Sequence, residues 1–387
     1  MFNSARVRHL ATAAAAHYAV IFAGIFAPVG DAASRIHMTG TFADNFIQWD
    51  SQWFVDIARY GYLLPLAVQR TFIPTGNVVP FTPAFKGAAF LPGLPVVLRI
   101  LGPILALVLV NLLFLCALAL MYRIVENERP ARAFPTVLLF AVGPCAIIFS
   151  SLYTESFTLF AVLLIMYGLQ NPMSSRRYWI ACVGACMATA FHDLGAFAAL
   201  FAIRLFRLRM PVRGLFFLAC LVLVPACYEW YLWSHFHTPF ALLTAEDSWH
   251  RHWSAPLANA LDAIVGGQFT TITAVTLAVA CLVACQAYVA LRCDLRLWAT
   301  PGQGIVCSLE TCLWMAAILF LGLCANMPNN PLESVLRFYA ILWPASLPVA
   351  RWPQADRATP AFWLALIGFA ATATLGSALF SHGWFFQ

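Results

Sequence analysis

A few ionisable side chains interrupt the long apolar stretches of this sequence. Glu155, Asp193 and Arg337 lie within or at the ends of such stretches, and His192 stands next to Asp193. A charge at the centre of a membrane-spanning helix costs about 2.5–3.5 kcal/mol on insertion scales, so such residues usually face a polar cavity or a charged partner. We therefore expect these four residues to bind a polar ligand. The alternatives are structural: the acids would cap the helices that follow them, and His192 would be a hydrogen-bonded core residue.

A second candidate segment, residues 48–62, reads QWDSQWFVDIARYGY and combines aromatic and acidic residues. The large apolar residues in and just before it recur at the spacing of one helix face: Phe46, Trp49, Trp53 and Ile57. Asp50 stands beside this stripe, and Gly61 is typical of a helix end. The pattern predicts an amphipathic helix lying along a membrane surface. The alternative is an aromatic belt with incidental acids.

Metal-binding patterns are weak in this sequence. His250 and His252 are two residues apart, and no HxxxH or HExxH motif is present. The 12 cysteines form no CxxC pair and lie in or beside apolar runs, where cysteine packs as a small apolar residue. We therefore expect no metal site, no disulfide framework and no bound cofactor.

The composition excludes an ordinary soluble enzyme. The chain has 387 residues, of which 62% are hydrophobic and 10% are charged, whereas soluble domains carry about 45–50% and 25%. Its formal charge of +6 is spread over short connections, so a nucleic-acid surface is not indicated. The sequence predicts an all-α, polytopic transmembrane helical bundle that forms a single integral membrane domain over residues 1–387.

The apolar runs predict about eleven transmembrane segments. They cover roughly 10–28, 88–122, 134–150, 154–170, 178–191, 194–208, 213–233, 268–291, 308–325, 334–350 and 361–380. With a cytoplasmic N-terminus and an anchored first span, 15 of the 22 basic residues lie inside and 11 of the 16 acids outside, as the positive-inside rule requires. Two long extracytoplasmic loops result, 29–87 and 234–267. Loops of that length are usually functional.

The segments around His192 are too short to cross a bilayer. Segments 178–191 and 194–208 have about 14 residues each, or ~21 Å of helix, against a hydrocarbon core of about 30 Å. The turn at His192 and Asp193 should therefore be recessed below the outer surface. Such a recess is tolerated where it lines a wet cavity or is buried in protein. The turn at residues 151–155 has the same form.

Four stretches together resemble a known family. They are Trp49-Asp50-Ser51-x-Trp53-Phe54-x-x-Ile57-Ala58-x-x-Gly61-Tyr62, Phe90-Leu91-Pro92-Gly93-Leu94-Pro95, Gly143-Pro144 through Ser151-x-Tyr153-Thr154-Glu155-Ser156, and Arg337-Phe338 with Pro344 beyond. Their order is similar to that of the PIG-V family of mannosyltransferases, in the multi-spanning GT-C class of glycosyltransferases, over about residues 46–345. Where the family carries an Arg before a small polar residue and Gly, this chain has His192, although Gly195 fits the pattern.

The resemblance implies an inverting glycosyltransferase that uses a polyprenyl-phosphate sugar, such as dolichyl or undecaprenyl phosphate mannose. A phosphate leaving group departs without protonation, so one carboxylate suffices as general base on the acceptor hydroxyl. On this reading Asp50 is the base and Arg337 holds the lipid phosphate. The other expected substrate-binding residues are Trp49, Trp53, Tyr62, Tyr153, Glu155, His192 and Asp193. The partners would be the lipid-linked donor, a lipid or glycan acceptor and membrane lipids.

Two other functions fit a polytopic protein with intramembrane charges. A secondary transporter would show inverted repeats and a site at the midplane, but no repeat is evident and the acids lie mainly outside. A lipid flippase or scaffold would bind the lipid without transferring sugar. The outer loops carry no Asn-x-Ser/Thr sequon and 21 of the 22 basic residues are Arg, which favours a bacterial plasma membrane over the endoplasmic reticulum.

Overall fold

The protein is a bundle of helices. The computed structural model describes residues 4–62, 86–248, 252–255, 258, 265, 304–306, 308–326, 335–347, 350 and 360–384. The predicted span 268–291 and parts of both long loops lie outside the described residues. Two strands of two residues each, β1 (His252–Trp253) and β2 (Ala325–Asn326), pair antiparallel. Apart from this short pair of strands, the described elements are helical, and the prediction of an all-α fold is confirmed.

The helical elements follow one another along the whole described chain. They are α1 (Ser4–Ile25), η1 (Phe42–Phe46), α2 (Asp50–Tyr60), α5 (Gly93–Glu128), η3 (Pro130–Arg132), α6 (Ala133–Ala141), α7 (Ala146–Ser150), α8 (Glu155–Leu169), α9 (Ser175–Phe191), η4 (Asp193–Phe201), α10 (Ala202–Arg207), α11 (Pro211–Phe236), α12 (Ala241–Ser248), α15 (Leu309–Cys324), α16 (Val335–Ala340), η6 (Trp343–Ser346) and α17 (Pro360–Ser381).

Three of these helices, α5, α11 and α17, are long and apolar enough to cross a membrane. Each exposes large apolar side chains along its length, for example Ile100 on α5, Val212 on α11 and Leu364 on α17, all more than 70% exposed. Exposed apolar faces of this kind are unfavourable in water and are suited to lipid. The prediction of about eleven spans is supported by the described residues only as far as these three helices.

Proline and glycine set most of the helix breaks. The expected kink near the start of the second segment is present in α5, where Gly102 has φ 73° just before Pro103; α5 then continues to Glu128, past the predicted end at residue 122. The predicted span 134–150 is two helices, α6 and α7. It breaks at Gly143-Pro144 because proline has no N–H to continue the helix. The predicted span 334–350 is likewise divided into the short α16 and η6, with Pro344 in the first turn of η6.

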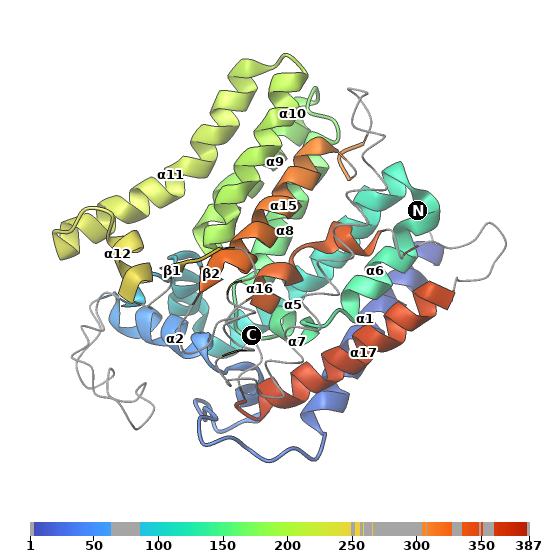
Figure 1. Ribbon diagram of the computed structural model, residues 1–387, viewed down its shortest axis with the longest axis vertical. Coiled ribbons are helices and arrows are strands. Elements are labelled where there is room, and N and C mark those ends of the chain that lie inside the picture. Colours follow the sequence, from blue (N-terminus) through green and yellow to red (C-terminus); the bar gives the residue numbers. More distant parts are fainter. Residues whose placement is uncertain are drawn as a thin grey trace.

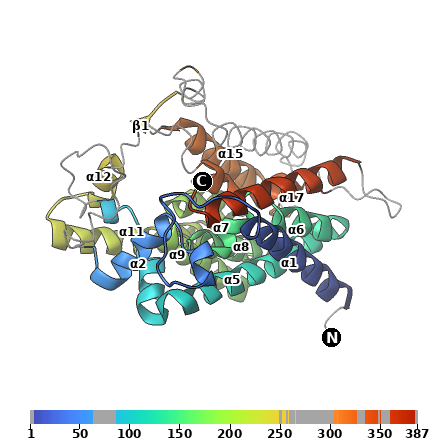
Figure 2. The same ribbon diagram turned by 90° about the horizontal axis from the view of Figure 1, so that it is seen from below.

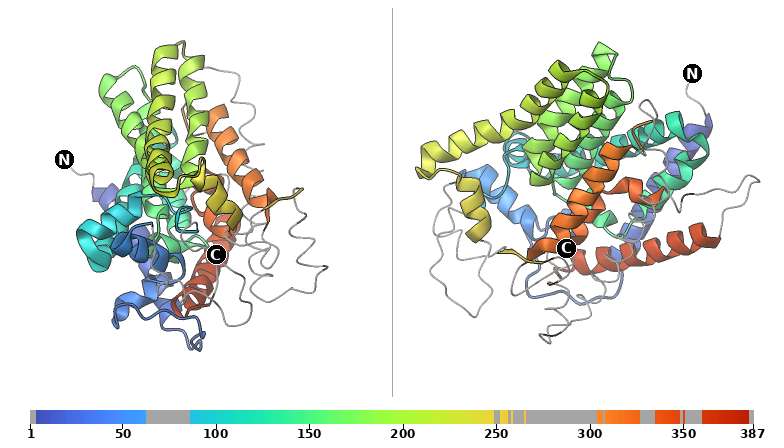
Figure 3. Two further views of the ribbon diagram at one scale, coloured as in Figure 1. Left: turned by 90° about the vertical axis from the view of Figure 1, so that its left-hand side faces the viewer. Right: turned by 45° about the horizontal axis from the view of Figure 1, so that its top comes forward.

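The helices form two groups joined by α5 (Figure 1). In the upper group α9 packs between α8 and α11. In the lower group α1 packs along α17 and α6 (Figure 2). Helix α5 contacts α8, α6 and α2, and α15 packs against η4 and α10 of the upper group (Figure 3). The largest apolar core is shared by α5, α8, α9, η4 and α15, and includes Phe114, Leu159, Ala185, Phe201 and Trp314.

Candidate active site

Arg337 on α16 lies between two carboxylates that come from distant parts of the chain. Its Nη1 contacts Oδ2 of Asp50, the first residue of α2, and its Nε lies 2.9 Å from Oε1 of Glu155, the first residue of α8. Its guanidinium also lies over the ring of Tyr153, 5.7 Å from the centroid. The structure thus brings together four of the predicted site residues, with a positive charge between two negative ones.

The ionic group continues from Glu155 to the turn after α9. Nε2 of His192 is 3.7 Å from Oε1 of Glu155, and its Nδ1 contacts Oδ1 of Asp193. The Asp193 carboxylate also accepts a hydrogen bond of 2.8 Å from the backbone N–H of Leu194, but the N-cap residue of η4 is His192, whose Nδ1 accepts from the same N–H (3.2 Å). Asp193 and Glu155 are thus the first residues of their helices, and the N-cap positions belong to His192 and Thr154.

Burial of these side chains increases from the outer residues to the centre. The Asp193 and Asp50 side chains are 46% and 26% exposed, whereas Arg337 is 11% exposed and Glu155 is 1% exposed. An unpaired carboxylate in such a place costs several kcal/mol, so Arg337 is required as its counter-ion. The group is accessible at Asp50 and Asp193 and closed at Glu155.

The segment 150–155, which we call the apex strap, joins α7 to α8 and holds Tyr153 and Glu155 against α2. The backbone N–H of Leu152 donates to the carbonyl of Phe46 (2.9 Å), and the Ser51 hydroxyl donates to the carbonyl of Leu152 (3.1 Å). The backbone N–H of Asp50 donates to the Tyr153 hydroxyl (3.2 Å). These bonds fix the backbone of Asp50 relative to that of Glu155.

The N-terminus of α2 has an unusual backbone. Trp49, the residue before Asp50, has φ 55° without being glycine, a conformation that costs about 1–3 kcal/mol and is concentrated at functional sites. Its indole Nε1 donates to the carbonyl of Trp384 (3.3 Å). The position of Asp50 at the first turn of α2 also places its carboxylate at the positive end of the helix dipole.

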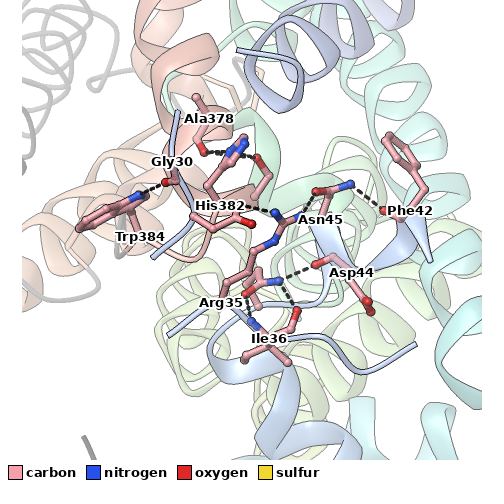
Figure 4. A network of polar contacts seen from close by, with 12 residues as sticks. Gly30, Arg35, Ile36, Phe42, Asp44, Asn45, Ala378, His382 and Trp384 are labelled. Carbon is pink, nitrogen blue, oxygen red and sulfur yellow. Dashed lines mark hydrogen bonds and ion pairs between the residues drawn. The ribbon is translucent and has the colours of Figure 1, made fainter. Parts of the chain in front are cut away.

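The loop before α2 is fastened to the end of α17 (Figure 4). Trp384 Nε1 donates to the carbonyl of Gly30 (2.8 Å), and Arg35 donates to the Asn45 side chain (2.9 Å). Asn45 in turn donates to the carbonyl of Phe42 (2.9 Å). These hydrogen bonds hold the loop before Trp49 against the C-terminal end of α17. They thereby fix the start of α2.

Two predicted substrate-binding residues are not part of the ionic group. Trp53 is stacked on Phe90 with ring centroids 5.6 Å apart, and Tyr62 donates to the carbonyl of Phe90 (2.9 Å). Both are buried in an apolar cluster with Tyr228 of α11. The aromatic stripe of α2 is thus packed inside the protein at Trp53 and Ile57, in place of the predicted membrane-surface contact, because residues 88–91, α11 and α12 cover it. The helix begins at Asp50, so Phe46 is not in it, and it ends before Gly61 as predicted.

The predicted turn between residues 191 and 194 is present. Helix α9 ends at Phe191, His192 is extended, and η4 begins at Asp193. A Cβ on Gly195 would lie 2.2 Å from the carbonyl oxygen of Ala188, so a larger residue would push η4 away from α9. This close packing explains why glycine is needed three residues after His192.

A comparison with protein families agrees with this arrangement. A family model described as Mannosyltransferase (PIG-V) matches residues 23–247. The chain belongs to this family. The matched region contains Asp50, the apex strap, Glu155 and His192, whereas Arg337 lies beyond it. The protein is therefore a membrane glycosyltransferase of the PIG-V mannosyltransferase family, and no curated protein matches the chain.

Some residues that build the site were not singled out from the sequence. Ser51 lies inside the quoted motif but was given no role, although its hydroxyl ties α2 to the apex strap. His17 was also missed, and it is a fully buried histidine in the first apolar helix. An ionisable residue at the centre of an apolar run is the signal that would have found it.

Asp56, on the same helix α2 as Asp50, gives a testable pH dependence. It is 7% exposed, and its Oδ2 has no hydrogen-bond partner among the described residues. Burial raises the pKa of this carboxyl to about 6, with Arg59 opposing the shift. Because the folded-state pKa lies above the ordinary value, Asp56 favours folding below about pH 4, and this contribution is lost as the pH rises through 6.

We expect Asp56→Asn to stabilise the protein by about 1–2 kcal/mol at pH 7.5 and by almost nothing at pH 4. Thermal unfolding in detergent at the two pH values measures the difference. Equal midpoints for variant and wild type at pH 7.5 would show that the Asp56 carboxylate is solvated or paired.

Proposed function

We propose that this protein transfers mannose, with inversion, from a polyprenyl-phosphate donor to a hydroxyl group of a lipid or glycan acceptor at the extracytoplasmic face. The observation that carries the proposal is the contact between Asp50 and Arg337, which joins the family motif of the first loop to a late helix. One group is a base for a hydroxyl and the other a cation for a phosphate. Their proximity is what sugar transfer from a lipid phosphate requires.

In the proposed reaction Asp50 takes the proton of the acceptor hydroxyl. The acceptor oxygen attacks C1 of the sugar from the face opposite the phosphate, the bond from C1 to the phosphate oxygen breaks, and its electron pair leaves with polyprenyl phosphate. Arg337 stabilises the negative charge that grows on that phosphate by charge-assisted hydrogen bonds. No acid is needed for the leaving group, in contrast to glycoside hydrolysis.

The ion pair implies an order of binding. Arg337 is occupied by Asp50 and Glu155 in the structure, so a donor phosphate must replace the more accessible of the two, Asp50, at the guanidinium. That replacement releases the Asp50 carboxylate to act as a base. We infer that the donor binds first and that the base becomes available only when the donor is present.

The buried end of the site suits the polar part of the substrates. Oε2 of Glu155 is buried and has no hydrogen-bond partner among the described residues, and a buried acceptor of this kind is favoured to bind a donor such as a sugar hydroxyl. His192 and Asp193 extend the same surface toward solvent. We propose that these three residues bind sugar hydroxyls or orient the acceptor, that Trp49 lines the opening, and that the buried Tyr153 supports the guanidinium of Arg337.

The charges at the two ends of α8 support the proposed orientation. Glu155 begins this helix of 15 residues, whereas at its other end the carbonyl of Leu169 accepts a hydrogen bond from Arg204 (2.8 Å). Arg207 pairs with Glu310 (3.3 Å) near the same end. About 22 Å of helix separates the two ends, less than the hydrocarbon thickness of about 30 Å. We infer a cytoplasmic Arg-rich end and a site recessed from the outer face.

The wider architecture that we propose is a GT-C-like bundle of about eleven spans in one integral membrane domain with a cytoplasmic N-terminus. The first outer loop, 29–87, would supply the catalytic motif and the second, 234–267, would face the acceptor side. A bacterial plasma membrane is the proposed location, because the basic residues are almost all Arg and the outer loops carry no sequon.

The direct test is transfer by the purified protein in detergent or vesicles. Dolichyl and undecaprenyl phosphate mannose labelled in the sugar are supplied with a membrane lipid extract as acceptor. We expect release of polyprenyl phosphate matched by a mannosylated product whose anomeric configuration is opposite to that of the donor. Binding of the donor without release of lipid phosphate would contradict the proposal and would favour a lipid-handling protein.

We also expect transfer to continue in the presence of a chelator. In the proposed reaction Arg337 neutralises the leaving phosphate, so no divalent cation is needed for this charge. With an excess of EDTA the initial rate should stay within about twofold of the untreated rate, because a guanidinium supplies the electrostatic stabilisation. Loss of transfer that is restored by Mg²⁺ or Mn²⁺ would show that a metal shares this role.

A further inference from the structure

His17 is a fully buried histidine on α1 with two hydrogen bonds that the proposed reaction does not use. Its Nδ1 is 2.7 Å from the carbonyl oxygen of Ala141, and its Nε2 is 2.9 Å from the hydroxyl oxygen of Ser150. Its ring also packs against Phe114 of α5, with centroids 4.2 Å apart. The imidazole therefore connects three parts of the fold, namely α1, the end of α6 and the end of α7.

The break between α6 and α7 explains why a histidine is needed there. Helix α6 ends at Ala141, and Pro144 prevents a regular continuation, so the Ala141 carbonyl lacks its usual helical partner. A carbonyl only accepts, so Nδ1 of His17 carries the proton that it donates to Ala141. In the neutral ring Nε2 is then an acceptor, and the Ser150 hydroxyl donates to it.

Asn111 on α5 holds Ser150 from the side opposite His17. The Asn111 side chain on α5 donates to the carbonyl of Ser150 (3.2 Å) and to that of Leu107 (2.9 Å). Its oxygen accepts from the Tyr18 hydroxyl (3.1 Å), which lies next to His17 on α1. Ser150 is thus fixed through both its side chain and its carbonyl.

Ser150 is the first residue of the apex strap, three residues before Tyr153 and five before Glu155. Beyond it, the Ser151 hydroxyl donates to the carbonyl of Ile147 in α7 (2.8 Å), and the bonds of Leu152 and Tyr153 described above hold the strap against η1 and α2. A displacement of Ser150 would therefore be passed along the strap to Tyr153 and Glu155, the two strap residues that contact Arg337. A shift of about 1 Å in a reacting group can cost 10²-fold in rate.

We propose that His17 is a positioning residue for transfer, which sets the place of Tyr153 and Glu155 relative to Arg337 through its hydrogen bond to Ser150. The proposal rests on the proposed function of this site. On this proposal α1, which is distant in sequence from Glu155 and Arg337, controls the geometry at the leaving phosphate. His17 touches neither substrate in this scheme and acts through the strap.

The test compares His17→Leu, which removes both hydrogen bonds at similar volume, with His17→Asn, whose side-chain amide N–H can still donate to Ala141. We expect His17→Leu to lower kcat about 10- to 100-fold with a change of less than about threefold in KM for the donor, since the strap and not the binding surface is displaced. His17→Asn should recover part of this loss. Ser150→Ala should give a loss similar to that of His17→Leu, and the double variant should be no worse than either single variant.

His9→Leu is the matched control. His9 lies on the same helix, bonds the Tyr122 hydroxyl (2.9 Å) and stacks on Phe134, but it does not contact the strap. We expect its kcat to equal that of the wild type. Equal loss of kcat in His9→Leu and His17→Leu would overturn the proposal, because it would show a general effect of altering α1.

Amide hydrogen exchange of residues 146–156 gives a readout that does not depend on transfer. His17→Leu should speed exchange in the strap by about tenfold or more while the remaining protected amides keep their rates, and His9→Leu should leave the strap unchanged. If the wild type transfers no sugar, the exchange data still decide the inference about His17. Unchanged strap exchange in both His17→Leu and Ser150→Ala would refute it.

Discussion

Replacing Asp50 with Asn is expected to lower kcat for sugar transfer by about 10²–10⁴-fold, the usual contribution of a general base. The amide keeps the size and the helix N-terminal position of the carboxylate but cannot take the acceptor proton. Initial rates with saturating donor and acceptor measure the change. The variant should insert and elute like the wild type, because Glu155 remains as the counter-ion of Arg337.

The same substitution tests the order of binding. In Asp50→Asn the guanidinium of Arg337 loses one of its two carboxylate partners, so a phosphate no longer competes with a charged group. We expect polyprenyl phosphate to bind about 3- to 10-fold more tightly than to the wild type, or roughly 1 kcal/mol. Equilibrium binding of the lipid phosphate alone provides this measurement.

The control for Asp50→Asn is Asp56→Asn. Asp56 is on the same helix and is also buried, but it makes no ion pair among the described residues. It should keep wild-type kcat and wild-type affinity for polyprenyl phosphate. Full transfer by Asp50→Asn would remove Asp50 as the base. Lost transfer with unchanged phosphate affinity would keep the base and reject the competition between Asp50 and the phosphate.

Replacing Arg337 is expected to affect both stability and activity. In Arg337→Gln the buried Glu155 carboxylate loses its closest counter-ion and keeps only the more distant His192 (3.7 Å), and breaking a buried ion pair by removing one partner destabilises a protein by about 3–5 kcal/mol. We expect the variant to accumulate poorly and to unfold at lower temperature. The yield of monodisperse protein in detergent and its thermal midpoint measure this effect.

A second substitution separates folding from function at this position. In Arg337→Gln with Glu155→Gln the buried charge is absent, so we expect the thermal midpoint to return most of the way to that of the wild type. Transfer should remain lost, because no cation is present to stabilise the leaving phosphate. Arg337→Lys should fold and retain a small activity, since a lysine keeps the charge but not the planar pair of donors.

Arg207 offers a matched control for these variants. It also forms a partly buried ion pair, with Glu310 at the opposite end of α8 (3.3 Å). Arg207→Lys should leave kcat within about twofold of the wild type, as expected for an ion pair that does not touch the reaction. If the double variant at positions 337 and 155 transferred sugar at the wild-type rate, Arg337 would not be the phosphate-binding residue.

Much of the architecture could be predicted because the membrane acts on local composition. A run of about 20 apolar residues is favourable in lipid whatever surrounds it, so the ends of α11 and α17 were located to within three residues and those of α1 and α5 to within six from the sequence alone. Proline has an equally local effect, and the kink at Pro103 was expected from it. The breaks at Pro144 and Pro344 were missed, because the surrounding apolar pattern continued across them.

The candidate site was predicted in its members but not in its contacts. Asp50, Glu155, His192, Asp193 and Arg337 were selected one by one, as motif residues or as charges in apolar surroundings. Trp53 and Tyr62 belong to the same motif, yet they pack against Phe90 and α11. A periodic aromatic stripe has the same appearance whether lipid or another helix covers it, so the sequence could not separate these two cases.

The sequence by itself thus determined that this is a helical membrane protein, which residues carry unusual charge, and to which family the motifs are similar. These properties follow from composition and local order, which need no knowledge of distant contacts. Only the tertiary structure decided that Arg337 lies between Asp50 and Glu155, and that His17 is hydrogen-bonded to Ser150 at the start of the apex strap. Contacts between residues more than 100 positions apart depend on how whole helices pack, and helix packing is set by the summed shape of many side chains.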